Sequence, residues 1–358
     1  CIYDCAYCIN RRTNDIPRAT LSVSELVDLT MEFYKRNYIE GLFLSSGVVR
    51  TPDYTMERLV RVVKDLRTVH RFNGYIHLKS IPGASRELVD EAGLYADRMS
   101  VNIEIPNEAS LKLLAPEKDH ESVYRPMEYI QQGVLESAEE RKKHRHAPRF
   151  VPAGQSTQMI VGATGESDRD ILFLSSALYG RPTMRRVYYS GYVAVNTYDP
   201  RLPALKQPPL VRENRLYQAD WLLRFYQFKG DEIVVATHPD LDLEVDPKLA
   251  WALRHPEQFP VDVNRAEYER ILRVPGIGVK SARLIVCSRR FGRLTSFDLK
   301  KMGCVMKRAQ YFITCGELEA KGVNELYPER VRSLLVQSKS RKKQNDGQLT
   351  LLFKEEPA

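Results

Sequence analysis

Residues 1–8 read CIYDCAYC, so cysteines stand at positions 1, 5 and 8 of the chain. The spacing Cys-x3-Cys-x2-Cys holds three thiols on one tight loop, and thiolates are soft ligands that suit iron–sulfur clusters and zinc. A zinc ribbon would need a second Cys-x2-Cys or a Cys/His pair nearby, and the nearest histidine is His70. Three thiolates on a four-iron cluster would leave one iron open to another molecule. The loop therefore predicts such a cluster, with structural zinc or inert thiols as the alternative.

The composition indicates a globular protein with a polyanionic partner. The chain has 358 residues, 43% of them hydrophobic, and a net charge of +8. Its length suggests one large domain and a smaller one, and its charge suits a nucleic acid. No apolar run approaches the roughly 20 residues of a membrane-spanning helix, and six cysteines are too few for a secreted disulfide framework. We expect a cytoplasmic protein without membrane contacts. Because the first residue is not Met, we also expect that the natural N-terminus lies upstream.

Apolar runs alternate with amphipathic stretches from about residue 22 to 200. The predicted strands are 40–46, 74–80, 98–106 and 185–195, together with a strand that runs into a Gly-rich turn over 154–166. The predicted helices are 23–36, 55–69, 85–96 and 168–180. Strands that alternate with helices favour parallel βαβ units, and this many in series favour a barrel or a large open sheet. In a (β/α) barrel, the working groups sit at the carboxyl ends of the strands. The sequence therefore predicts an α/β fold with its site at that edge.

The cysteine loop resembles the radical S-adenosylmethionine (SAM) superfamily. The superfamily motif Cys-x3-Cys-x-aromatic-Cys is matched by Cys1, Cys5, Tyr7 and Cys8. The resemblance implies a partial (β/α)6 TIM-like barrel whose first strand lies upstream of Cys1. It also implies a [4Fe-4S] cluster on the three cysteines, with SAM bound to the open iron. Reductive cleavage of SAM, with electrons from an electron donor, would yield a 5′-deoxyadenosyl radical that abstracts a hydrogen atom.

The same resemblance implies a set of SAM-binding residues. The family carries a Gly-Gly-Glu-Pro-like turn after its second strand, and Ser-Ser-Gly occupies 45–47 here without the acidic residue. Polar ribose ligands end the fourth strand, where this chain has Asn102 and Glu104, although Glu104 could equally be a solvated strand end. Ile160, Gly162 and Gly165 of the fifth-strand motif would line the adenine. The implied cofactor-binding residues are Tyr7, Ser45, Ser46, Gly47, Asn102, Glu104, Ile160 and Gly162. The sequence assigns no catalytic side chain.

The stretch LRVPGIGVKSARLI (272–285) has the pattern shared with helix-hairpin-helix DNA-binding modules. Gly276 and Gly278 would let the hairpin backbone approach a phosphate, which amide groups at the start of the second helix would bind. Lys280 adds positive charge. Such contacts read the nucleic-acid backbone and not its sequence. The alternative is an ordinary glycine-bearing turn inside a packing domain.

The composition divides the chain into four parts. We expect the barrel over 1–200, a connector over 201–258, an all-α helix-hairpin-helix domain over 259–337 and a flexible tail over 338–358. Within the connector, a helix is expected over 216–228 and a strand over 232–237. In the tail, Gln348, Leu351 and Phe353 fit Q-x-x-L-x-F, which resembles the peptide that bacterial replication and repair proteins insert into the sliding clamp. Otherwise the apolar end of the tail would fold back onto the domain.

The order of these parts is similar to that of a bacterial radical SAM family assigned to DNA modification or repair. The resemblance implies an enzyme that uses the radical on a base or sugar of DNA. A second hypothesis keeps the enzyme but makes RNA or tRNA the substrate. A third is a non-enzymatic iron–sulfur protein that binds DNA or serves as a scaffold.

Overall fold

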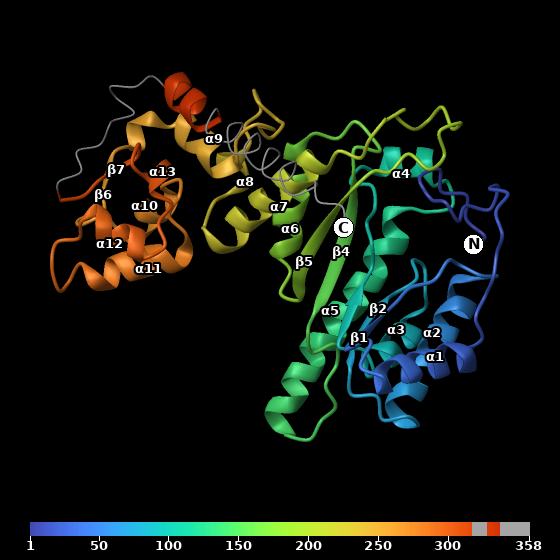
Figure 1. Ribbon diagram of the computed structural model, residues 1–358. Helices are drawn as coiled ribbons and strands as arrows, with labels where there is room; N and C mark the ends of the chain where they lie inside the picture. Colours follow the sequence, from blue (N-terminus) through green and yellow to red (C-terminus); the bar gives the residue numbers. More distant parts are fainter. Residues whose placement is uncertain (317–327, 337–358) are drawn as a thin grey trace, which may run out of the picture. The chain divides into compact units, whose positions relative to one another are not determined.

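The computed structural model of the chain describes residues 1–316 and 328–336 (Figure 1). It divides into two compact units, Cys1–Glu213 and Asn214–Ala358. The connector expected over 201–258 is therefore shared between the two units. The tail with Gln348, Leu351 and Phe353 lies outside the described residues.

The first unit is built on one parallel sheet, which confirms the predicted α/β fold. Its strands are adjacent in chain order: β1 (Gly41–Leu44), β2 (Tyr75–Lys79), β3 (Arg98–Ser100), β4 (Gln155–Val161) and β5 (Met184–Gly191). Helix α1 (Val23–Lys35) precedes β1. The helices between the strands are α2 (Pro52–Thr68), α3 (Arg86–Gly93), α4 (Glu108–Leu114), α5 (His120–Lys143) and α6 (Asp168–Tyr179). Each connection between parallel strands contains a helix, as a parallel crossover requires (Figure 1).

The two faces of this sheet differ in chemistry. Ile76, Leu78 and Met99 are fully buried on the face that the helices cover. Alternate residues point to the opposite face, where Phe43 of β1 and Tyr188 of β5 line the same cavity of about 350 Å³. Since the first and last strands of the sheet both line this one cavity, the sheet is curved and the cavity occupies its concave face.

The second unit is mostly helical. Its elements are α7 (Leu210–Phe225), which begins in the first unit, α8 (Gly230–Ile233), α9 (Pro247–Arg254), a 3-10 helix (Pro256–Gln258), α10 (Tyr268–Arg273), α11 (Val279–Ser288), α12 (Ser296–Lys301) and α13 (Met306–Ala309). Residues 328–336 are also helical. None of the helices in the described part of the chain is long and apolar enough to cross a membrane.

Two predictions for this unit were wrong. The unit is not all-α, because β6 (Val261–Asp262) pairs in parallel with β7 (Ile313–Thr314). The residues 232–237 do not form a strand: Ile233 ends α8, and Val235 makes only an isolated bridge to His238. A short apolar run fits a buried helix end as well as a strand, so periodicity alone could not distinguish them.

Candidate functional site

The cysteine loop is fixed at the carboxyl edge of the sheet. The backbone N–H of Ile2 donates to the Val48 carbonyl at 2.8 Å, and the N–H of Ala6 donates to the Leu114 carbonyl at 2.7 Å. The side-chain amide of Asn196 donates to the Ala6 carbonyl at 2.5 Å. Val48, Leu114 and Asn196 follow β1, β3 and β5 respectively, and the carboxyl ends of parallel strands share one edge. The loop therefore lies where a (β/α) fold carries its working groups.

A nearly buried ion-pair network braces the same loop from within. The Arg11 guanidinium, only 6% exposed, donates to Asp4 at 2.9 Å and to Asp199 at 2.7 Å. Arg201 also bonds to Asp199, at 2.6 Å. The hydrogen bond from Arg11 holds the pKa of Asp4 well below its usual range, and the bonds from Arg201 and Arg11 do the same for Asp199. These charges tie the cysteine loop to the segment after β5.

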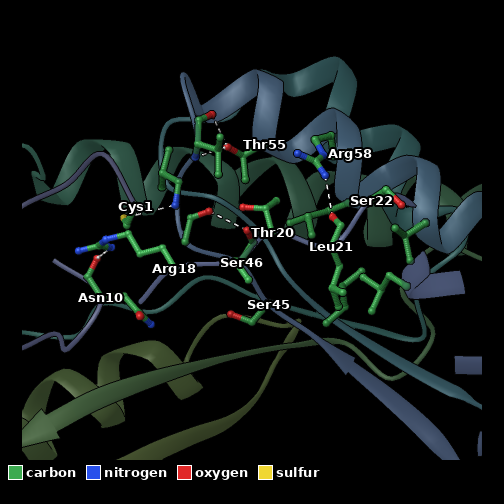
Figure 2. A pocket seen from close by; sticks show the side chains of 18 of the residues that line it. Cys1, Asn10, Arg18, Thr20, Leu21, Ser22, Ser45, Ser46, Thr55 and Arg58 are labelled. Atoms are coloured by element: carbon green, nitrogen blue, oxygen red, sulfur yellow. Dashed lines mark hydrogen bonds between the residues drawn. The ribbon is translucent and has the colours of Figure 1, made fainter. Parts of the chain in front are cut away.

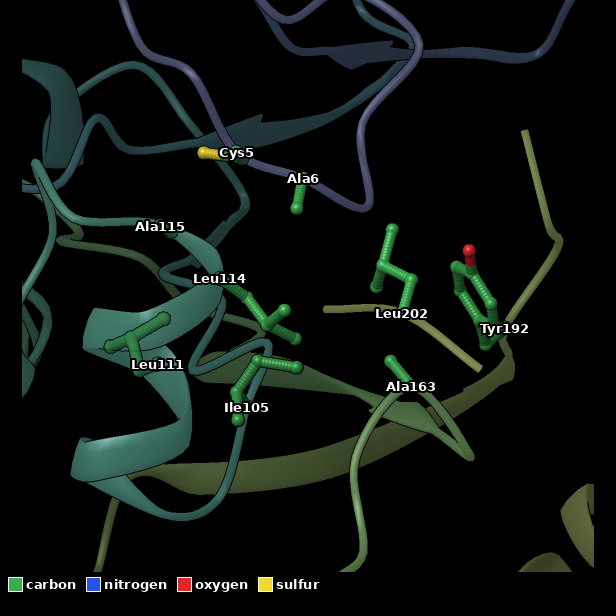
Figure 3. Packing of buried hydrophobic residues seen from close by; sticks show 9 residues of the cluster. All are labelled: Cys5, Ala6, Ile105, Leu111, Leu114, Ala115, Ala163, Tyr192 and Leu202. Carbon is green, nitrogen blue, oxygen red and sulfur yellow. The ribbon is translucent and has the colours of Figure 1, made fainter. Parts of the chain in front are cut away.

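The three thiols of the loop are free but differ in surroundings. Cys5 is buried against an apolar cluster that includes Ile105 and Leu114 (Figure 3), and burial raises its pKa. Cys1 is half-buried, and its Sγ accepts a hydrogen bond from the Val48 N–H at 3.4 Å. At Gly47 an added Cβ would stand 3.1 Å from the Cys1 Cβ, so only glycine leaves ordinary room beside this cysteine.

The predicted turn residues Ser45, Ser46 and Gly47 gather beside Cys1. All four line a cavity of about 490 Å³ between the cysteine loop and α2 (Figure 2). The Ser46 hydroxyl donates to the Gly47 carbonyl at 2.6 Å. The structure thus brings together one of the predicted thiolates and the whole predicted turn.

The backbone at Glu104 is unusual. Its φ is +63°, in the left-handed region that non-glycine residues seldom occupy. The Glu104 N–H donates to the Gln158 carbonyl at 2.9 Å, and the Glu104 carbonyl accepts from the Ile160 N–H at 2.7 Å. These bonds form an isolated parallel bridge between Glu104 and Met159 of β4 and hold the residue in place. The regular strand β3 ends at Ser100, earlier than the predicted 98–106.

The side chain of Glu104 is a nearly buried counter-ion and not a solvated strand end. Its carboxylate lies 3.4 Å from Lys118 Nζ and 3.5 Å from Lys79 Nζ. Burial would raise the pKa of Glu104, but the charges of Lys118 and Lys79 outweigh it and lower the pKa to about 2. Lys118 also lies 3.5 Å from the Tyr7 hydroxyl. Burial and the Glu104 charge raise the Tyr7 pKa well above its ordinary value, so Tyr7 keeps its proton.

Asn102 lies in the other cavity, on the concave face of the sheet. The lining residues are Phe43, His77, Ser100, Asn102, Ser156, Thr157, Gln158 and Tyr188. Burial and the nearby Arg98 charge lower the His77 pKa to about 4, so the ring is neutral at pH 7. The Asn102 amide group donates a hydrogen bond to Gln158 Oε1 at 3.2 Å. This bond leaves Asn102 Oδ1 as an acceptor and Gln158 Nε2 as a donor for a bound molecule. The cavity therefore offers uncharged donors and acceptors between two aromatic rings.

The remaining predicted cofactor residues lie elsewhere around the loop. Ile160 packs against the apolar cluster of Cys5, together with Tyr7. Gly162 has a φ of +85°, and a Cβ there would stand 3.0 Å from the Pro209 side chain. The predicted set is thus divided between two cavities and the apolar cluster of Cys5 and does not line a single cavity.

Sequence reasoning missed several residues that hold this site. They are Asp4, Arg11, Lys118, Asn196 and Asp199. Asp4 and Arg11 carried a weak signal, since they are charged residues inside and beside a cysteine-rich loop. The other three lie more than 100 positions away and carried none.

In the helical hairpin of the second unit, Gly276 packs against the same unit, whereas it was expected to approach a phosphate. The Gly276 carbonyl accepts from the Val305 N–H at 2.8 Å, and a Cβ on Gly276 would stand 2.7 Å from the Val305 carbonyl. This close approach is packing within the unit, which was the alternative reading of the motif. Gly278 precedes α11, Lys280 is exposed on its first turn, and the phenol oxygen of Tyr226 accepts a hydrogen bond from the Val279 N–H.

Comparison with known families decides what the cysteine loop belongs to. The family model of the radical SAM superfamily matches residues 1–174, which include the loop and strands β1 to β4. Residues 1–174 form a radical SAM domain. Members of the superfamily use a [4Fe-4S] cluster and SAM, and these are the cofactors of this domain.

Solved structures similar to the chain include two hydrogenase maturases. HydG, a maturase of the [FeFe]-hydrogenase, is 14% identical over 62% of this chain and 47% of its own, with a TM-score of 0.47. The FeFe-hydrogenase maturase HydG from Carboxydothermus hydrogenoformans is 13% identical over 62% of this chain and 48% of its own, with a TM-score of 0.46. The chain spans about half the length of these structures. No curated protein matches it.

The donors in the radical SAM domain fit a four-iron cluster. Across residues 1–316 and 328–336, no three His, Cys, Asp or Glu side chains surround a single metal-ion position. A four-iron cluster does not require such convergence, because each cysteine binds a different iron atom. Three free thiols on one braced loop, one of them accepting an amide hydrogen bond, supply the soft anionic donors that iron–sulfur clusters take.

Proposed function

We propose that the protein is a radical SAM enzyme that modifies or repairs DNA. The observation that carries the proposal is the placement of the Cys1–Cys5–Cys8 loop at the carboxyl edge of a curved parallel sheet. The concave face of that sheet holds a cavity of about 350 Å³ lined by uncharged polar and aromatic groups. The same unit thus contains both the cysteine loop that would hold the radical-generating cluster and a cavity that suits an uncharged substrate.

Cys1, Cys5 and Cys8 would hold the cluster, and the turn 45–47 beside Cys1 would contact SAM. When bound, the cluster and SAM supply a 5′-deoxyadenosyl radical, and an external electron donor supplies the electron. The chain's own residues position and shield this chemistry. The Val48 N–H stabilises negative charge on the Cys1 sulfur, and apolar neighbours exclude water around Cys5.

Glu104 gives the domain a fixed negative charge beside the loop. Because Lys79 and Lys118 keep it ionised, its carboxylate can accept hydrogen bonds but cannot release a proton at neutral pH. A carboxylate in this state suits the two hydroxyl groups of a ribose. This supports the assignment of Glu104 as a SAM contact and gives it no acid or base role.

A nucleobase fits the cavity on the concave face. Asn102 Oδ1 and Gln158 Nε2 present one acceptor and one donor, the pair of groups that reads the edge of a base. Phe43 and Tyr188 present aromatic surface on which a ring can stack. A base in a duplex would have to be flipped or unpaired to enter.

The case for DNA rests on the second unit and the charge of the chain. The net charge is +8, and α10 and α11 flank the hairpin 274–278 in the order of a helix-hairpin-helix module. Gly278 and the exposed Lys280 open the first turn of α11, where a helix favours a phosphate. RNA remains the second candidate, since backbone contacts of this kind do not distinguish the polymers sharply. The scaffolding hypothesis differs from both in predicting no cleavage of SAM.

Mass spectrometry of nucleosides tests the proposal. If the enzyme modifies DNA, we expect a modified nucleoside in DNA from cells that contain the protein and none in cells that lack the gene. If it repairs DNA, we expect a damaged nucleoside to persist only in cells that lack the gene. A cavity variant, Tyr188→Ala, should lose this difference while the purified protein still forms 5′-deoxyadenosine, because Tyr188 lines the cavity proposed for the base and is not among the predicted SAM contacts. A difference confined to RNA nucleosides, or no difference in either polymer, would contradict the DNA assignment.

Competition between DNA and RNA of equal length at one salt concentration provides the matching binding test.

We further propose that the tail docks on the bacterial sliding clamp in the cytoplasm. Gln348 supplies a polar anchor and Leu351 and Phe353 supply apolar ones. Replacing Gln348 and Phe353 by alanine should abolish co-purification with the clamp, since short docking peptides depend on a few anchors. The control is Lys354→Ala, which leaves the three anchors intact. Unchanged co-purification of the double variant would contradict the tail assignment.

A further inference from the structure

The loop after α11 exposes one phenylalanine almost completely. Phe291 is 93% exposed, more than any other large apolar residue in the described part of the chain. An apolar ring in this position adds nothing to the core, so it is available to contact a partner at the surface. The neighbouring residues indicate what kind of partner.

Four arginines line a hollow of about 470 Å³ together with this phenylalanine. The lining residues are Asp262, Asn264, Arg265, Arg289, Arg290, Phe291, Gly292 and Arg293. The lining contains one carboxylate, that of Asp262, which lies 3.8 Å from Arg265. Arg265 is 89% exposed, and Arg290 and Arg293 are exposed as well. The hollow, called here the arginine hollow, is therefore strongly basic and open to solvent.

The loop that carries these side chains is pinned at both ends. The Arg289 guanidinium donates to the Val263 and Ala266 carbonyls, at 3.2 and 2.5 Å. The Asn264 side chain exchanges two hydrogen bonds with the Leu294 backbone, donating at 3.1 Å and accepting at 2.8 Å. Between these anchors, residues 290–293 are held away from the core. A partner would meet a preformed arrangement and would not have to order a loose segment.

We propose that the arginine hollow binds an unpaired stretch of DNA, with phosphates on the arginines and one base stacked on Phe291. Guanidinium groups bind phosphate oxygens through two parallel hydrogen bonds. An exposed aromatic ring next to such groups binds the face of a base, and that face is covered in a duplex but free in a single strand. An acidic peptide would satisfy the arginines but would leave the isolated aromatic ring without a matching partner.

This inference rests on the proposed function in one respect only, the nucleic-acid substrate. It adds that the unit prefers DNA whose bases are already unpaired. Such DNA is the form from which a base reaches an enclosed site at least cost. It is independent of the hairpin motif, because the arginine hollow is lined by residues before α10 and after α11, whereas the hairpin 274–278 lies between these two helices.

Fluorescence anisotropy tests the inference with the complete protein and two probes, a labelled 20-nucleotide oligo(dT) and a labelled 20-base-pair duplex. We expect Phe291→Ala to weaken binding of the single strand about tenfold, in the range found for one stacked base, and to leave duplex binding unchanged. Arg290→Ala combined with Arg293→Ala should lower the slope of log affinity against log salt by about 1.4 for the single strand. Phe297→Ala is the matched control, because Phe297 is an exposed phenylalanine of the same unit outside the hollow.

The outcomes separate this inference from the proposed function. If Phe291→Ala binds oligo(dT) as tightly as the wild type, or if polyglutamate competes as well as oligo(dT), the arginine hollow does not bind unpaired DNA. If the wild type binds neither probe while SAM is still cleaved, both the DNA substrate and this inference fall and the radical enzyme stands. Formation of 5′-deoxyadenosine without DNA should be the same for Phe291→Ala and the wild type. A matching thermal unfolding midpoint confirms that the exposed substitution leaves the fold intact.

Discussion

Replacement of Cys1, Cys5 or Cys8 by alanine should each lower the yield of 5′-deoxyadenosine from SAM by more than about 100-fold, which exceeds the usual effect of losing a partner behind a metal ligand. Each substitution removes one of only three thiolates on the loop, and no fourth cysteine lies near enough in the chain to replace it. The iron content per protein should fall together with the yield. The measurement is anaerobic reconstitution, iron analysis, and chromatography of the products formed with a strong reductant.

Cys287→Ala is the matched control for these variants. Cys287 is an exposed cysteine on α11 in the second unit, and it should be replaceable without loss of iron or of SAM cleavage. A cysteine-loop variant that keeps its iron and its yield would exclude that thiol as a ligand. Recovery of one zinc ion and no iron from the wild type would instead support the structural-zinc alternative and would remove the basis for a radical enzyme.

Replacement of Lys118 by methionine should lower the free energy of unfolding by about 3 kcal/mol, as expected when one partner of a buried ion pair is removed. Glu104 and Lys118 are both nearly buried and lie 3.4 Å apart. Without Lys118, the carboxylate keeps Lys79 at 3.5 Å but loses half of its compensating charge. Adding Glu104→Gln should recover most of the loss, because the remaining amide carries no charge. Urea unfolding of the two single variants and the double variant measures this coupling.

The pH dependence of the free energy of unfolding is a second test of the pair Glu104–Lys118. The Glu104 pKa is lowered from 4.5 to about 2, so its contribution to stability is fully present above pH 4.5 and is lost as the pH falls toward 2. The loss amounts to about 3 kcal/mol in the wild type and should be smaller in Lys118→Met. Lys112→Met is the control, because Lys112 pairs with Glu108 at the surface and such pairs contribute about 0–1 kcal/mol. Equal effects of the two lysine substitutions would contradict the role given to Glu104.

Local pattern was enough for much of the first unit. Alternation of apolar runs and amphipathic stretches predicted β1, β2, β4 and β5 to within a few residues, since a buried parallel strand and a covering helix each leave a periodic signature. The third strand was predicted too long: regular pairing ends at Ser100, although the apolar pattern continues to 105, and the positive φ of Glu104 has no signature in the sequence. In the second unit, the two-residue strands β6 and β7 were missed because they are too short to show a period.

At the candidate site, too, some features follow from local sequence and others only from the tertiary structure. The sequence by itself determined the three thiols and their family, because eight consecutive residues form one loop whatever the rest of the chain does. Only the tertiary structure decided what surrounds them: Arg11 meets Asp199 across 188 positions, and Glu104 lies between two lysines that flank it in the chain. The physical reason is that electrostatic energies depend on distance and burial in space. Neither quantity can be read from positions along a chain, so a charge that stabilises the site looks the same in sequence as one that faces water.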